Sequence, residues 1–226
     1  RAAFFAGVPT PNGATYSTSD DPKRWENHTA VRKIEAENVA PRLLLRGEGH
    51  TSDGVASQEA LTMVGDPKRR LVALVINAID ASLKGDTQQR HEWTVDSIGS
   101  LAQLLEKARE AGRAVLFAAD HGHVPGDLLA SKGAYTDAST RYRSWRDPSD
   151  PIGEDEVGFH GTGVCATKGA HGLICLSDEH SRYGSAAHAG EHGGASFAEV
   201  VALCLLVVFD DGRDAFDSAQ KVMLMA

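Results

Sequence analysis

Short apolar runs separated by amphipathic or polar segments predict a mixed α/β fold. The runs 71–76 and 114–119 are rich in strand-forming residues and too short for a buried helix, so both predict buried strands of a parallel sheet. Between them, Thr94 or Asp96 caps a predicted helix that Gly112 ends. The apolar face of this helix is formed by Ile98, Leu101, Leu104, Leu105 and Ala108. The order strand, helix, strand predicts a βαβ unit.

Outside this unit the pattern predicts smaller elements. Residues 8–21 are rich in Pro, Gly, Asn, Ser and Thr and predict an exposed loop, whereas 123–155 form a long polar stretch. A connection of that length is either a functional cover or a mobile surface loop. The other predicted elements are a polar helix from Asp21, a short strand at 43–45, a helix at 57–64 and strands at 157–166 and 171–176.

Candidate metal ligands follow both predicted central strands. Asp80 comes after the first strand, and Asp120 and His121 come directly after the second. Ligands bind at the carboxyl ends of the strands in open α/β sheets. A carboxylate beside an imidazole suits zinc, manganese or iron. Each residue taken alone is equally well explained as a capping Asp or a hydrogen-bonded His.

A third group of candidates lies in the glycine-rich stretch 183–195. His188 and His192 stand in this loop just before Ser196, and Glu199 completes a predicted capping box at the start of a helix. The glycines would let His192 approach a metal closely, although a tight turn with exposed histidines explains the same residues. The sheet would gather this loop and the two strand ends on one rim, which favours a site where two divalent ions clamp a phosphoryl group.

Composition narrows the class of protein. The chain has 226 residues, 42% of them hydrophobic and 24% charged, which fits one soluble globular domain. Its net charge of -8 argues against a chain-wide nucleic-acid surface but leaves direct DNA binding through a local groove open. The three cysteines have no CxxC spacing, which favours a cytoplasmic protein. No apolar stretch reaches the roughly 18 residues needed to span a membrane.

The order of these motifs resembles the alkaline phosphatase superfamily, and within it the PglZ proteins of the BREX and phage-growth-limitation antiviral systems. The residues that carry the resemblance are 77–80, 85–86, 119–124 and 192–196 with Glu199. The resemblance implies a three-layer α/β/α sandwich with a mostly parallel central sheet. It also implies metal ligands at Asp80, Asp120, His121 and His192. Asp86 and His91 compete for a further ligand position, and His188 is a weaker candidate.

The resemblance also implies how the chain is organised. Residues 1–226 form a single PglZ-like domain that lacks its N-terminal portion, because 1–7 resembles the segment that follows the family's catalytic nucleophile. The nucleophilic Ser or Thr and an early Asp ligand are therefore expected upstream of Arg1. Arg141 and Arg143 are candidates for contact with a substrate phosphate, although arginines in a polar stretch commonly face solvent.

The function implied is that of a metal-dependent phosphatase or phosphodiesterase in anti-phage defence. Its expected cofactors are two divalent ions, zinc or manganese, and its expected partners are a phosphate-ester or nucleotide substrate and other defence-system proteins. One alternative is a non-catalytic scaffold with a vestigial metal site. Another is a serine hydrolase, because residues 194–198 approximate a nucleophile elbow, although that motif requires a strand before the serine.

Overall fold

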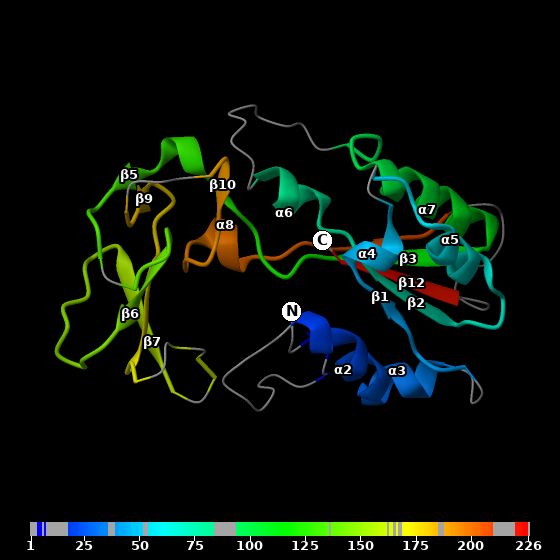
Figure 1. Cartoon of the computed structure of the whole chain (residues 1–226), viewed down its shortest axis with the longest axis horizontal. Coiled ribbons are helices and arrows are strands. Elements are labelled where there is room, and N and C mark those ends of the chain that lie inside the picture. The colour runs from blue at the N-terminus through cyan, green and yellow to red at the C-terminus, as the bar shows by residue number, and fades with distance from the viewer. Residues whose placement is uncertain are drawn as a thin grey trace.

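A computed structural model gives the fold as a mixed α/β arrangement (Figure 1). It describes residues 4–5, 7, 18–35, 39–51, 54–83, 94–135, 137–161, 163–164, 166, 169–184, 188–209 and 220–225, with only the backbone of Arg46 and of 220–225. Within these ranges, no helix combines the length and the apolar character needed to cross a membrane.

The largest sheet has five strands in the order β1, β2, β12, β3, β11. The first four run parallel to their neighbours, and β11 pairs antiparallel with β3 at the edge. Its strands are β1 (Leu43–Leu44), β2 (Leu71–Val75), β3 (Arg113–Ala118), β11 (Cys204–Val207) and β12 (Gln220–Met225).

Helices pack on both faces of this sheet because alternate side chains of β2 point in opposite directions. Val72 and Leu74 pack in one apolar cluster with residues of α5 (Gln58–Gly65) and α7 (Gly99–Glu110). Leu71, Ala73 and Val75 pack in a second cluster with residues of α2 (Asp21–Asn27) and α3 (Thr29–Ile34). The remaining helical segments are η1 (Thr18–Asp20), α4 (Arg46–Gly49), α6 (Ala78–Leu83), η2 (Gly126–Leu128) and α8 (Phe197–Val200).

Three smaller sheets form the other end of the molecule (Figure 1). The three-stranded one has the order β6, β8, β7 and is antiparallel, as is the pair β4 and β10, whereas β5 and β9 are parallel. Their strands are β4 (Val124–Pro125), β5 (Ala130–Ser131), β6 (Tyr142–Trp145), β7 (Glu156–His160), β8 (Gly172–Leu176), β9 (Ser181–Arg182) and β10 (Gly190–Glu191).

The mixed α/β class predicted from the sequence is confirmed, and the two predicted central strands correspond to β2 and β3. The helix between them begins later than predicted, at Gly99. Thr94 and Ser97 instead close a separate turn, in which the Ser97 amide donates to the Thr94 hydroxyl at 3.2 Å. Outside the five-stranded sheet most pairings are antiparallel, which the predicted mostly parallel arrangement did not include.

Two local predictions need correction. The polar stretch 123–155 is not one long loop, since it contains β4, η2, β5 and β6. The strand predicted at 157–166 ends at His160, where Gly161 takes a positive φ of 105°. The predicted helix start at Ser196 is confirmed; this helix, α8, has four residues, and the chain then joins the sheet as β11, which pairs with β3.

Candidate metal centre

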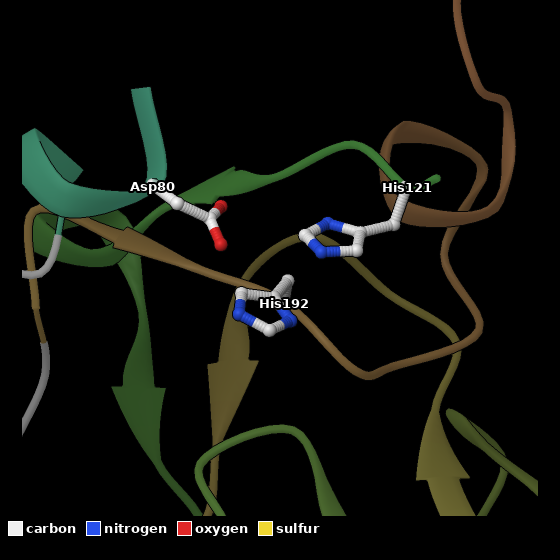
Figure 2. A group of neighbouring side chains, drawn as sticks. All are labelled: Asp80, His121 and His192. Carbon is white, nitrogen blue, oxygen red and sulfur yellow. The ribbon is translucent and has the colours of Figure 1, made fainter. Parts of the chain in front are cut away.

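Three segments far apart in the sequence bring Asp80, His121 and His192 together (Figure 2). Asp80 lies in the first turn of α6, directly after β2, and His121 follows β3. His192 follows β10 in the glycine-rich loop. One ligand atom from each side chain lies within 4.8 Å of the others, and all three side chains are half-buried. The sequence prediction that these residues share one rim of the fold therefore agrees with the geometry.

The two histidines of this group are held in a defined orientation. Their rings stack with centroids 4.2 Å apart and an interplanar angle of 17°. His121 Nδ1 lies 3.1 Å from the carbonyl oxygen of Gly122, so the tautomer with a proton on Nδ1 satisfies both atoms. That tautomer leaves the lone pair of Nε2 available to a metal. Asp120 Oδ1 lies 3.6 Å from Nε2 of His121, so Asp120 neighbours the group of Asp80, His121 and His192 without being one of its three members.

His123 is a member of the site that the sequence prediction missed. Its Nε2 lies 3.0 Å from Asp80 Oδ1, and its ring packs against those of His121 and His192 at centroid distances of 4.9 and 5.2 Å. Burial lowers the pKa of His123, and the nearby His121 lowers it further, although Asp80 and Asp120 act in the opposite direction. The second His of the Asp-His-Gly-His motif was the available signal.

A buried ion pair holds the loop that carries His192. Arg141 donates to the two Glu199 carboxylate oxygens at 3.0 and 2.8 Å, and both side chains are almost fully buried. The same carboxylate accepts from the Gly194 amide at 2.8 Å and the Ser196 hydroxyl at 2.6 Å. Burial alone would raise the pKa of Glu199, but these hydrogen bonds outweigh it and lower the pKa. The predicted reach of Glu199 back to Ser196 is present.

Two glycines allow the segment that carries His121 and the segment that carries His192 to approach each other. A Cβ on Gly122 would lie 2.0 Å from the carbonyl oxygen of Ala198 in α8, and the Gly122 amide donates to the Glu199 carbonyl at 2.8 Å. A Cβ on Gly194 would lie 2.5 Å from Glu199 Oε2. Contacts this short leave no room for a side chain at either position.

Other predicted site residues are placed differently. Asp86 and His91 lie outside the described residues. His188 is exposed, and its backbone amide donates to Glu191 at 2.6 Å. Ser196 is fully buried and its hydroxyl is bonded to Glu199, so it lacks the exposure that the nucleophile of a serine hydrolase needs.

Both candidate phosphate-binding arginines are occupied by internal partners. Arg141 has no exposed surface and, besides Glu199, donates to the carbonyl oxygens of Asp178 and Ser181. Arg143 is also buried and donates to the Glu156 carboxylate at 3.2 and 2.9 Å. The structure therefore gives both arginines the role of internal braces and does not support phosphate contact by either.

Comparison with known proteins identifies the family. Residues 15–205 match the model of the BREX system PglZ alkaline phosphatase-like domain. The chain belongs to the PglZ family. No curated protein and no solved structure matches it. As a PglZ domain, the chain is a component of a multi-protein BREX defence system and belongs to the alkaline phosphatase-like superfamily, whose members typically use divalent metal ions.

The donor set of this PglZ domain fits such an ion. One carboxylate and two imidazoles are a common three-residue ligand set for zinc, with a further position left for water or substrate. The bond from His121 to the Gly122 carbonyl is the kind of outer contact that orients a ligating imidazole. The site thus fits a divalent metal by chemistry and by spacing.

Proposed function

We propose that this PglZ domain is a metal-dependent phosphohydrolase, a phosphatase or phosphodiesterase that acts on a phosphate ester or nucleotide within the defence system. The observation that carries the proposal is the convergence of Asp80, His121 and His192 from three distant segments. Membership of the alkaline phosphatase-like superfamily supports it. We also propose that the five-stranded sheet is the centre of a three-layer sandwich like that of the superfamily, which the helices on both of its faces support.

The residues of the chain have distinct roles in this proposal. Asp80, His121 and His192 hold a zinc or manganese ion, and Asp120, beside His121, contributes to a second ion. A bound ion stabilises the negative charge that develops on the phosphoryl oxygens. His123 orients the Asp80 carboxylate through its 3.0 Å contact. Asp86, with His91 and His188 as alternatives, remains a proposed further ligand.

The first test is metal content. We expect the zinc-dialysed protein to retain zinc, and the Asp80→Ala and His192→Ala variants to lose it, because each removes one of three ligands. His180→Ala is the matched control, since His180 is an exposed histidine outside this group. The zinc content of the parent and of the three variants is measured by mass spectrometry. Equal zinc in the parent and in both ligand variants would refute the site.

The second test is activity. Because the resemblance implies a nucleophilic Ser or Thr that is not among the residues of the candidate metal centre, hydrolysis of bis(4-nitrophenyl) phosphate is measured on the intact protein. We expect Asp120→Ala to abolish turnover while the thermal unfolding midpoint stays close to that of the parent. Unchanged turnover in that variant would contradict the proposed catalytic role.

A non-catalytic scaffold is the second candidate function, and one observation favours it. Apolar side chains of α8 and β11 and of the residues between them are exposed, among them Phe197 at 76% and Leu203 at 63%. Exposed apolar surface of this kind often marks a contact with another protein. If the domain is a scaffold, phage protection in cells survives Asp80→Ala and is lost with Phe197→Asp. The opposite pattern supports the enzyme.

A further inference from the structure

A cavity of about 630 Å³ lies directly beside the candidate metal centre, because His192 belongs to both. This volume is within the range of cavities that bind small molecules. Tyr135, Tyr142 and Tyr183 line it together with the loop residues His192 and Gly193. A group joined to a phosphate at the metal centre would therefore have the cavity next to it.

The aromatic walls of the cavity are held in place by the surrounding structure. Tyr183 is 1% exposed, and its hydroxyl donates to Glu156. Tyr135 packs edge to face on Tyr183 with ring centroids 5.0 Å apart, and the guanidinium of Arg143 lies 5.1 Å from the centre of the Tyr135 ring. Two rings of the lining are thus fixed before any ligand arrives.

Tyr142 lies against the loop that carries His192. Its ring carbon Cδ1 lies 3.2 Å from where a Cβ on Gly193 would be, and Gly193 directly follows His192. The side chain is nevertheless 37% exposed, so part of its ring is free to contact a ligand. Its position beside the His192 loop makes it a suitable surface for a flat group to stack on.

The charges around the cavity restrict what it can bind. Its described lining contains no lysine or arginine, and its carboxylate, Glu191, is 4% exposed and accepts from Thr140 and the His188 amide. A second phosphate or another anion would find no lysine or arginine in this described lining and would meet a buried negative charge. An uncharged ring would lose little on leaving water and would gain contact with the tyrosines.

We propose that this cavity binds the organic group of the phosphate ester and that Tyr142 makes the site selective for esters whose organic group is a flat, uncharged ring. This inference rests on the proposed function, since it places the phosphate at the Asp80, His121 and His192 group.

Binding of three simple ligands to the zinc-loaded full-length protein tests the inference. Inorganic phosphate, methyl phosphate and phenyl phosphate are titrated by calorimetry. We expect phenyl phosphate to bind about tenfold more tightly than methyl phosphate, a difference of about 1.4 kcal/mol that is typical of one aromatic contact. A fourth ligand, 4-carboxyphenyl phosphate, is titrated in the same way, and we expect it to lose this advantage because its added charge would lie near Glu191.

Variants assign the preference to Tyr142. Tyr142→Ala should remove the preference for phenyl phosphate and leave methyl phosphate affinity unchanged, whereas Tyr142→Phe should keep the preference. Phe159→Ala is the matched control, because Phe159 is an exposed aromatic residue of the same sheet outside the described lining of the cavity. Circular dichroism confirms that each variant is folded.

The outcomes separate this inference from the proposed function. If all three ligands bind but phenyl phosphate has no advantage, or keeps it in Tyr142→Ala, the ring-binding inference is refuted and the phosphate site stands. If neither phosphate nor either ester binds the zinc-loaded protein, the proposed function fails and the inference fails with it.

Discussion

Replacing Arg141 with methionine should destabilise the protein severely. Methionine keeps much of the apolar stem of the side chain but removes the guanidinium group from a site with no exposure. The Glu199 carboxylate would then remain buried with only the Gly194 amide and the amide and hydroxyl of Ser196 as donors. The carbonyl oxygens of Asp178 and Ser181 would each lose a donor as well.

The size of the effect follows from burial. Breaking a buried ion pair by removing one partner typically costs about 3–5 kcal/mol, because the other charge stays buried without compensation. A domain of ordinary stability has a free energy of unfolding of about 5–15 kcal/mol, so the loss would be a large fraction of the total. Replacing both Arg141 and Glu199 with apolar residues should recover much of this loss, since no unpaired charge then remains.

The stability lost in Arg141→Met should also depend on pH in a defined direction. In the parent, hydrogen bonds lower the pKa of Glu199, so the carboxylate contributes stability above the unfolded-state pKa of about 4.3, and this contribution is lost as the pH falls through the folded-state pKa. Without Arg141, burial dominates and raises the pKa of Glu199. The stability difference between parent and Arg141→Met should therefore be largest at pH 7 and shrink toward pH 4.

Urea unfolding followed by circular dichroism measures these free energies. Arg146→Met is the matched control, because Arg146 is 62% exposed and its ion pair with Asp137 lies at the surface. We expect the control to change stability by less than about 0.5 kcal/mol. A loss below about 1 kcal/mol in Arg141→Met, or a double variant no more stable than the single one, would show that the buried pair does not hold the fold.

Three further predictions concern the candidate metal centre and the buried Glu156. Arg143, the Gly153 amide and Tyr183 outweigh the effect of burial and lower the pKa of Glu156 to about 2. The charged carboxylate therefore contributes on the order of 3 kcal/mol of stability above pH 4.5, and the parent loses this contribution as the pH falls toward 2. Glu156→Gln should lack this contribution, which acid unfolding curves of the two proteins measure. Gly122→Ala should lower both the thermal midpoint and zinc affinity, because its Cβ would strike a carbonyl oxygen; Gly47→Ala, with open space around it, should change neither. His123→Phe should weaken zinc binding about tenfold in a competition titration by removing the partner of Asp80, and an unchanged affinity would contradict that positioning role.

Sequence reasoning located the candidate ligands whose position in the fold depends on the local pattern of residues. A short apolar run identifies a strand, and the residue that ends it lies at the rim of the sheet whatever the rest of the fold does. This reasoning placed Asp80 and His121 correctly relative to β2 and β3. The glycine-rich loop placed His192 with them because glycines permit the close approach that is observed at Gly194.

The missed features depend on pairing between distant residues. Arg141 and Glu199 are 58 positions apart, and nothing in a polar stretch indicates that an arginine there will be fully buried. The capping signal at Ser196 was correct, but the pairing of β11 with β3 decided the structure a few residues later. The strands in 123–155 are short and depend on partners such as β8 and β10, so their local pattern is weak.

The contacts of Glu199 imply that metal binding and the internal ion pair are thermodynamically coupled. Its backbone carbonyl holds the Gly122 amide, next to His121, and its side chain holds the Gly194 amide, two residues from His192. The segments that carry His121 and His192 are thus both fixed by Glu199, and the buried carboxylate of Glu199 is paired with the charge of Arg141. A metal that binds the folded state stabilises it according to its affinity, so zinc should stabilise the parent more than Arg141→Met. This difference separates a brace of the metal centre from an ion pair that serves the fold alone.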